Sequence, residues 1–316
     1  EYQAGRREWN KRSKEGFLNS IKHFNTAIEL DPNYADPYTG LADAYSLMEF
    51  YQYASRDEVI PIAKRNAKLA LEKNPNLSKA YVSMAGLLYN YEYNWIDAEK
   101  NFKRAIELNP NYATGMQWYA FLLRNKGDFY QSLDKLIRAE QSDPSSMIIK
   151  CDLAYIHYAL GNNKEALIYA DKALAIEPNF RRVLRLKYVH LLSEGTSKAI
   201  ERFNVLLNSG ENEIEDRFAL FNLHLKSNNK LMALEQLSHI TGDIKTSREN
   251  CSLIAIMYFN INNIEYANDW LHQAILSRET GEMFWDLIIS DKFKQLHKNE
   301  RFKILMKSIN HPAFID

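Results

Sequence analysis

One phrase recurs along the chain at a spacing close to 34 residues, and this recurrence constrains the fold more than any other feature. It reads TAIELDPNY at residues 26–34, RAIELNPNY at 104–112 and KALAIEPNF at 172–180. Its proline occurs at spacings of 43, 35, 34 and 34 residues, at Pro32, Pro75, Pro110, Pro144 and Pro178. Because regular self-similarity marks a repeated structural unit, the repeat decides the architecture.

A small residue stands twelve positions before each of these prolines, and its series continues beyond the last of them. The series is Ser20, Ala63, Ala98, Ser132, Ala166, Ala199, Ala233 and Ala267. Four positions later the chain usually carries a bulky apolar residue, such as Phe24 or Phe102, and seven positions later an alanine. Offsets of 4 and 7 lie on one face of a helix, so the pattern predicts helices that approach their neighbours closely.

Each unit contains a second amphipathic segment upstream, as in AYVSMAGLLYN at 80–90 and IIKCDLAYIHYAL at 148–160. Turn sequences separate the two segments: NKGD at 125–128, LGNN at 160–163, SNN at 227–229 and INN at 261–263. Gly and Asn in these turns can take the left-handed conformation that ends a helix. The Asp-Pro or Asn-Pro pair then ends the second helix, because proline donates no amide hydrogen bond. Each unit is therefore predicted to be a pair of helices.

This spacing of Ala, aromatic and Pro residues resembles the tetratricopeptide repeat. The resemblance implies an all-α fold, a right-handed α-solenoid of about eight helix-turn-helix units with C-terminal capping helices. We expect the solenoid to span residues 1–278 and the capping helices, or a degenerate ninth unit, to span 279–316. The expected units are 1–34, 35–77, 78–112, 113–146, 147–180, 181–213, 214–247 and 248–278. Two departures are visible, because the first-helix Trp is replaced throughout and units six to eight lack the terminal Pro.

The second unit carries nine extra residues around LMEFYQYASRDEVIP. Ser55 and Glu58 have capping-box spacing, and Pro61 suits a position near a helix start. We therefore expect an extended aromatic loop at 49–56 followed by a new helix. Phe50, Tyr51 and Tyr53 either pack back on the solenoid, which we favour, or bind a partner.

Catalytic and cofactor motifs are missing from the sequence. It has no glycine-rich phosphate loop, no GxSxG, no HExxH and no EF-hand run, and no two histidines stand at i, i+4. Cys151 and Cys251 are expected as free thiols, since they lie three units apart in first helices. We predict that the chain is not an enzyme and needs no cofactor or metal.

Composition narrows the class of partner. Lys plus Arg and Asp plus Glu both number 40, so the chain has no net positive field, and we predict no direct binding of nucleic acid. The basic residues Arg6, Arg7, Lys11, Arg12 and Lys14 are expected to form an exposed capping face. No apolar run approaches the roughly 18 residues of a membrane span. The chain begins at Glu1 without a signal peptide, so we expect a processed chain or an excised fragment in the cytoplasm.

In the tetratricopeptide family, ligand contacts come mostly from positions 2, 5, 9, 12 and 13 of the first helix. The resemblance places partner contacts at Val82, Tyr89, Asn90, Gln117, Phe121, Arg124, Asn125, Tyr155, Tyr158, Arg182 and Arg185. Aromatic and arginine side chains anchor protein interfaces, although several of these tyrosines could instead seal the packing between first helices. The Lys and Asn of the family's carboxylate clamp are absent, since Gly5 and Trp9, or Thr39 and Asp43, occupy the corresponding positions.

Some stretches of sequence go beyond the generic repeat pattern and resemble the C-terminal repeat arrays of bacterial signalling proteins. Examples are GLADAYSLMEFY at 40–51 and DPSSMIIKCDLAYIHYALGN at 143–162. Those arrays follow a winged-helix DNA-binding domain, a kinase or a cyclase. The resemblance implies a non-catalytic scaffold that binds a peptide or protein in its concave groove and regulates a larger protein. The alternatives are a small-molecule-sensing regulatory domain and, least favoured, an enzyme. Two copies could also associate through the end helices.

Overall fold

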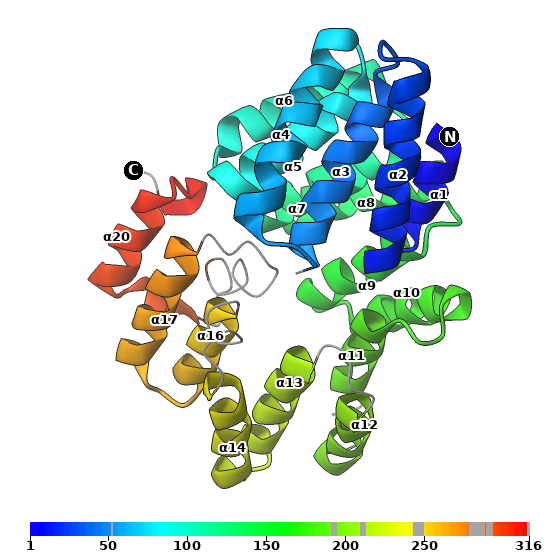
Figure 1. The fold of residues 1–316 in the computed structure, drawn as a ribbon. Coiled ribbons are helices and arrows are strands. Elements are labelled where there is room, and N and C mark those ends of the chain that lie inside the picture. Colours follow the sequence, from blue (N-terminus) through cyan, green and yellow to red (C-terminus); the bar gives the residue numbers. More distant parts are fainter. Residues whose placement is uncertain are drawn as a thin grey trace. The chain divides into compact units, whose positions relative to one another are not determined.

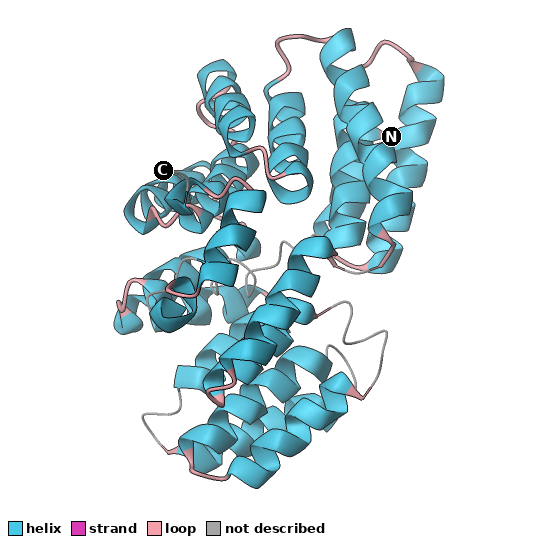
Figure 2. Ribbon diagram, turned by 90° about the vertical axis from the view of Figure 1, so that its left-hand side faces the viewer, coloured by secondary structure: helices cyan, strands magenta, loops and turns pink. Residues whose placement is uncertain are grey.

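The structure is a computed structural model, and it describes residues 1–51, 53–190, 195–208, 213–242, 250–277, 288 and 293–314. Within these ranges the regular structure is helical and no strand occurs (Figures 1 and 2). The chain divides into two compact parts. The N-terminal part comprises residues 1–123 and 141–144, and the C-terminal part comprises residues 124–140 and 145–316. The predicted all-α solenoid of helix pairs is confirmed.

Helices of the N-terminal part alternate between first and second members of a pair. They are α1 (Tyr2–Asn10), α2 (Lys14–Leu30), α3 (Asp36–Phe50), α4 (Arg56–Lys73), α5 (Ser78–Glu92) and α6 (Trp95–Leu108). The next two helices, α7 (Ala113–Asn125) and α8 (Phe129–Ser142), each contribute residues to both parts. The first helices α1, α3 and α5 contact one another in order, and each also contacts its own second helix.

The C-terminal part continues the alternation. Its helices are α9 (Met147–Ala159), α10 (Asn163–Ile176), α11 (Arg181–His190), α12 (Thr196–Asn208), α13 (Glu213–Lys226), α14 (Lys230–Thr241), α16 (Cys251–Asn260) and α17 (Ile264–Leu276). Three short elements follow, α19 (Lys294–His297), α20 (Glu300–Ser308) and the 3-10 turn η3 (Pro312–Phe314). The first helices α9, α11, α13 and α16 contact one another in order.

The series of small residues found in the sequence lies at the centre of the packing. Every member from Ser20 to Ala267 is at most 3% exposed. Close approach is most demanding around Phe24, which is fully buried between Gly5 of α1 and Gly40 of α3. A methyl group on Gly5 would lie 2.5 Å from the Phe24 ring, and one on Gly40 would lie 2.6 Å from it. These two glycines therefore let α1, α2 and α3 close around one aromatic ring.

The turns inside the helix pairs have the predicted left-handed residues. The backbone φ is +89° at Gly127, +77° at Gly161, +58° at Asn228 and +63° at Asn262. In two of these turns the following asparagine caps the second helix, because Asn229 accepts from the amide of Met232 and Asn263 from that of Tyr266. The double asparagine thus ends one helix and begins the next.

The repeated phrase between pairs forms a hydrogen-bonded turn. Asp31, Asn74 and Asn109 each accept, through a side-chain oxygen, the amide two residues later at 2.9, 3.0 and 3.2 Å. Tyr38 and Tyr81, which replace the signature Trp, donate their hydroxyls to the carbonyls of Pro32 and Pro75 at 3.1 and 3.0 Å. The tyrosines therefore tie each first helix to the end of the preceding pair.

The insertion in the second pair lengthens helices more than it forms a loop. Helix α3 continues to Phe50, and α4 has 18 residues, with Pro61 inside it and no side-chain hydrogen bond from Ser55 at its cap. The predicted capping box is thus wrong. Tyr51 and Tyr53 stack on each other and pack against Phe17, as the favoured interpretation held, while Phe50 remains 50% exposed.

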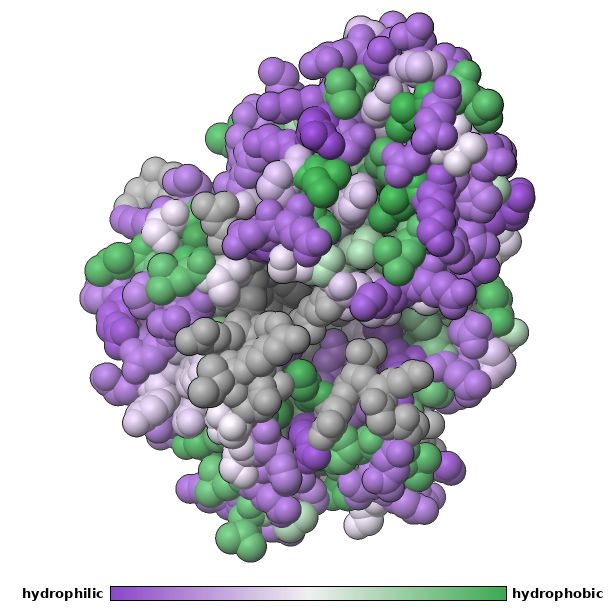
Figure 3. Space-filling model, viewed as in Figure 1, coloured by the Kyte–Doolittle hydropathy of each residue, from purple (hydrophilic) through white to green (hydrophobic). Residues whose placement is uncertain are grey.

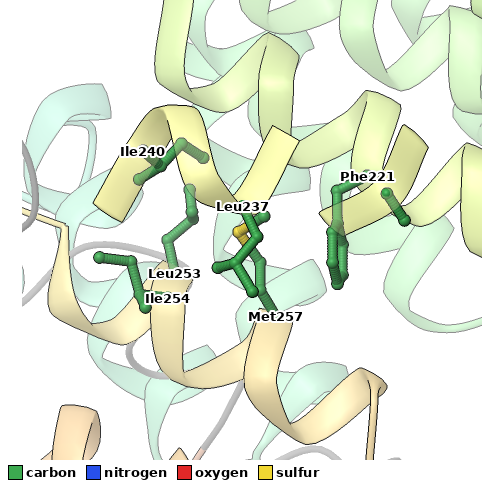
Figure 4. Packing of buried hydrophobic residues seen from close by; sticks show 7 residues of the cluster. Phe221, Leu237, Ile240, Leu253, Ile254 and Met257 are labelled. Carbon is green, nitrogen blue, oxygen red and sulfur yellow. The ribbon is translucent and has the colours of Figure 1, made fainter. Parts of the chain in front are cut away.

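An apolar cluster joins α13, α14 and α16 in the C-terminal part (Figure 4). Its side chains come from these three helices and pack against one another: Phe221, Ala233, Leu237, Ile240, Leu253, Ile254 and Met257. Beyond it, α20 contacts α17 and buries Phe302 and Met306. The predicted helix at MFWDLII lies outside the described residues except for Ile288, so the extent of the capping region stays a prediction.

Candidate functional site

The candidate site residues lie on first helices, and each part of the chain carries one set of polar side chains. In the N-terminal part, an N-terminal cluster links α1, α3 and α5; its members are Tyr2, Arg6, Asp36, Asp43, Lys79 and Ser83. Arg6 Nη1 donates to Asp43 Oδ2 at 3.2 Å, and Ser83 Oγ donates to Asp43 Oδ1 at 2.6 Å. Lys79 Nζ donates to Asp36 Oδ1 at 2.6 Å and to Tyr2 Oη at 3.0 Å. Each cation thus bridges neighbouring first helices.

Burial controls the titration of this cluster. Desolvation raises the pKa of the Asp43 carboxyl, against the lowering effect of Arg6 and the Ser83 hydroxyl. Desolvation also raises the pKa of the nearby Tyr112 hydroxyl to about 12. Burial alone would lower the pKa of Lys79, but its hydrogen bonds to Asp36 and Tyr2 outweigh burial and raise it. Lys79 and Tyr112 therefore stay protonated near neutral pH, and Lys79 donates hydrogen bonds to Asp36 and Tyr2.

A second set, the C-terminal network, links α9, α11 and α13 in the C-terminal part. Its members are Asp152, Tyr155, Arg181, Arg182, Arg185, Glu215 and Asp216. Asp216 is fully buried and accepts from both Arg181 and Arg185, the latter at 2.7 Å. Arg185 also pairs with Glu215, which is 55% exposed at its side chain. Two arginines of α11 are therefore fixed by one buried carboxylate of α13.

Arg182 extends the network toward α9. Its Nη1 donates to Asp152 Oδ1 at 2.8 Å, and its guanidinium lies 4.6 Å from the centre of the Tyr155 ring. Tyr155 in turn donates its hydroxyl to the backbone carbonyl of Arg182 at 2.9 Å. Three contacts thus hold Arg182 and Tyr155 in one geometry, with 27% of the Arg182 side chain exposed.

Several predicted contact residues of α5 and α7 are buried inside the chain. Val82 is 1% exposed, and a methyl group on Gly115 would lie 3.0 Å from its Cγ2. Tyr89, 6% exposed, packs its ring against Trp95. Gln117 and Asn125 are 5% and 1% exposed. These four side chains are buried in this structure, and for Tyr89 the contact with Trp95 fits the alternative that it seals the packing.

The other predicted residues keep accessible surface. Asn90, Phe121, Arg124, Tyr155, Arg182 and Arg185 are partly buried, and Tyr158 is 41% exposed. Arg124 Nε donates to Asn125 Oδ1 at 3.2 Å. The structure brings Tyr155, Arg182 and Arg185 together in the C-terminal network. Whether these residues contact a partner stays a prediction.

Sequence analysis missed the acidic members of both sets. Asp43 was noted only as a mismatch to the carboxylate clamp, and Asp152 and Asp216 were not singled out. A signal was available for Asp43 and Asp152, because each stands in a first-helix segment whose neighbours are mostly apolar. A carboxylate in such a segment needs a buried cationic partner.

Surface and metal chemistry add no further site. On the face shown in Figure 3, hydrophobic residues form separate patches among hydrophilic ones. In the part of the chain that the structure describes, His, Cys, Asp and Glu form no group of three that could hold a metal ion. Over the same residues, no helix combines the length and apolar character that crossing a bilayer requires.

Comparison with known proteins identifies the repeat. A family model described as "Tetratricopeptide repeat" matches residues 149–180, the stretch that contains nearly all of α9 and the whole of α10. The family model matches one helix pair, and the other pairs resemble that pair in their fold. The repeat inferred from the sequence is confirmed.

Two curated relatives match about half of the chain. Anaphase-promoting complex subunit 3 of Schizosaccharomyces pombe is 25% identical over 160 residues, which are 51% of this chain and 23% of the relative. Transcriptional regulator HilA of Salmonella typhimurium is 24% identical over 159 residues, which are 49% of this chain and 29% of the relative. The aligned residues thus cover less than a third of either relative.

Among solved structures, the Cut9–Hcn1 hetero-tetramer of the APC/C is similar with a TM-score of 0.59 at 16% identity. The likeness covers 95% of this chain and 56% of that one. At this identity the likeness establishes the fold and nothing more.

Proposed function

We propose that this chain is a non-catalytic scaffold that binds a peptide or protein segment along its first helices, as the regulatory part of a larger protein. The observation that carries the proposal is the C-terminal network. Its buried ion pairs hold Tyr155 and Arg182 rigid before any partner arrives, and the exposed Tyr158 lies one turn further along α9. Fixed aromatic and arginine side chains bind with little loss of side-chain entropy.

The names of the relatives support this class of function. One is a subunit of a complex, the similar solved structure is a hetero-tetramer, and HilA is a transcriptional regulator. An array of helix pairs offers an extended surface to such partners. We infer that a regulatory protein would use the array to recognise another protein.

A second candidate is a small-molecule-sensing regulatory domain. The N-terminal cluster favours it, because Arg6, Lys79 and the Tyr2 hydroxyl come together from neighbouring helices, and the Arg6 and Lys79 side chains are 19% and 32% exposed. A ligand with several acceptor oxygens would suit these groups. A ligand bound there would contact α1, α3 and α5 together.

Site-specific photo-crosslinking distinguishes the candidates. Benzoylphenylalanine replaces Tyr158 in one variant and Tyr130, which is 78% exposed on second helix α8, in a matched control. The scaffold proposal expects a protein adduct at position 158 that excess unlabelled wild-type chain suppresses, and none at 130. Adducts at 130 alone would place binding on the other face. A small molecule retained in native mass spectrometry and lost on Lys79→Met would favour sensing instead.

A further inference from the structure

A buried hydrogen bond joins two residues that are 186 positions apart in the C-terminal part. His311 Nε2 lies 3.1 Å from the backbone carbonyl oxygen of Asn125, at the end of α7. Both residues are buried, at 0% and 1% exposure. A carbonyl oxygen only accepts, so Nε2 of His311 carries a proton and donates it in this hydrogen bond.

The segment that carries His311 is anchored at its other end to the last helix pair. We call residues 293–314 the C-terminal strap. The Phe293 ring packs edge-on against Phe259 of α16, with centroids 5.0 Å apart, and Arg301 pairs with Asp269 of α17 at 2.7 Å. Phe302 and Met306 are fully buried. The strap thus starts on α16 and α17 and reaches Asn125, the last residue of α7.

The contact between His311 and Asn125 is unusual for a repeat array. In a solenoid each repeat contacts its neighbours, so residues far apart in the chain do not meet. Here the strap bypasses the helices between α8 and α16 to reach Asn125. The rings of His311, Phe314 and Phe302 form one cluster at the end of the strap, with centroids 5.6 and 5.4 Å apart.

We propose that the C-terminal strap is a releasable cover of the end of α7, which keeps Asn125 from any partner while it is closed and exposes Asn125 when it opens. This inference concerns the chain alone and does not depend on the proposed function. It gives a reason for the burial of Asn125, a position at which the family resemblance places partner contacts.

Acid is expected to open the strap. Desolvation lowers the pKa of His311 from its ordinary 6.5 to about 4, and the hydrogen bond to Asn125 offsets part of this effect. The nearby His297 of α19 lowers it further. Other charged residues of the adjoining elements are Lys294 of α19, Glu300, Arg301, Lys303 and Lys307 of α20, Arg124 of α7, and Lys126 and Asp128 of the turn. A proton therefore binds the open state first, and closure weakens as the pH falls from 6.5 toward 4.

Hydrogen exchange measured by mass spectrometry on the full chain tests the proposal. Two peptides report it, one covering residues 124–132 and one covering 306–314. With rates corrected for intrinsic exchange, both should open roughly 30-fold more between pH 8 and pH 5, the factor that pKa values of 6.5 open and 4 closed imply. Exchange in α16 reports whether the fold as a whole is affected.

Three variants make the test specific. His311→Ala should raise exchange in both peptides at pH 8 by on the order of tenfold. His311→Gln retains an amide donor but cannot be protonated, so it should stay closed and lose the pH response. His239→Gln, at an exposed histidine of α14, should behave as wild type.

Two outcomes overturn the proposal. If His311→Ala frees residues 306–314 but leaves 124–132 unchanged, the strap does not cover the end of α7. If His311→Gln keeps the full pH response, the opening proton binds elsewhere. Should His311→Ala unfold the chain, the glutamine variant still decides between these results.

Discussion

Within each part of the chain, neighbouring first helices pack together, and the physical reason differs between the two parts. In the N-terminal part, α1 and α3 close around Phe24 because Gly5 and Gly40 leave room for its ring. In the C-terminal part, α11 and α13 are joined by Arg181, Arg185 and the buried Asp216. One contact depends on the shapes of side chains and the other on buried charge.

The difference shows how a repeat can conserve its geometry while changing its chemistry. The small-residue series and the left-handed turns are shared by both parts and fix how each pair is built. The contact between one helix pair and the next is less constrained. Apolar side chains that fill the space between first helices serve there, and so do ion pairs between those helices. That freedom lets the same surface carry binding groups.

Loss of the buried carboxylate should have the largest effect. Asp216→Ala leaves Arg181 and Arg185 buried without their shared partner, so we expect a loss of about 3–5 kcal/mol in the free energy of unfolding. Urea denaturation followed by circular dichroism measures it. Glu215→Gln removes an exposed partner of Arg185 and should cost no more than about 1 kcal/mol.

An apolar replacement sharpens the same point. Replacing Arg181 and Arg185 by Met and Asp216 by Leu together should restore most of the stability that Asp216→Ala loses, because no buried charge then remains. If the triple variant is as unstable as Asp216→Ala, the contact depends on shape, and the contrast between the two parts fails.

Adding a methyl group at a first-helix glycine of the N-terminal part should have the next largest effect on the free energy of unfolding. Gly40→Ala places a methyl group 2.6 Å from the Phe24 ring, which Gly5 confines from the other side. We expect a net loss of about 1–3 kcal/mol in unfolding free energy, despite the higher helix propensity of alanine. A Phe24→Leu background should reduce the cost.

Gly86→Ala is the matched control for Gly40→Ala. It also lies in a first helix, but its nearest neighbour, Trp118, would be 3.2 Å from the new methyl group. Its cost should be smaller. Equal costs at the two sites would show that helix backbone, and not the Phe24 contact, determines the result.

The tyrosines that replace the signature Trp should have a smaller effect. Tyr38→Phe removes the hydroxyl that donates to the Pro32 carbonyl, so we expect a loss of about 1 kcal/mol or less. Thermal unfolding of Tyr38→Phe and Tyr81→Phe, singly and combined, tests whether the costs add. Tyr45→Phe is the control, since its hydroxyl makes no hydrogen bond to the described residues.

The smallest expected effect is a difference between the two parts in how their stability responds to acid. Burial lowers the pKa of His157 and His224 in the C-terminal part, so their contribution to stability is lost as the pH falls below 6.5. Burial raises the pKa of Asp43 in the N-terminal part, so protonation there relieves a cost as the pH falls. Hydrogen exchange measured at pH 5 and pH 7 should show that the amides of α9 and α13 lose protection at pH 5 relative to those of α3. His157→Gln should remove the response of α9, and a uniform response of both parts would contradict the assignment.

The repeat was predictable because its signals are local. Gly127, Gly161, Asn228 and Asn262 end helices through their own backbone preferences, and the small residues obey helical periodicity whatever surrounds them. The insertion was less predictable, since α3 and α4 could lengthen by packing Tyr51 and Tyr53 on Phe17. Tertiary contact decided that segment, and no local preference reports it.

The candidate site was predictable only in outline. Periodicity identified Tyr155, Arg182 and Arg185 as first-helix residues, but their shared orientation depends on Asp152 and Asp216, which come from other repeats. Burial of Val82 and Gln117 likewise depends on neighbours that a single-helix pattern does not identify. The contact of His311 with Asn125 spans 186 residues and had no signal in the repeat.

The two thiols of the chain have a use that their chemistry alone does not suggest. Cys151 in α9 and Cys251 in α16 are both buried, and both belong to the C-terminal part. A buried thiol reacts with an alkylating reagent only when its surroundings open. The rates of modification at these two positions would therefore time the opening of the C-terminal part, while the cysteine-free N-terminal part remains silent.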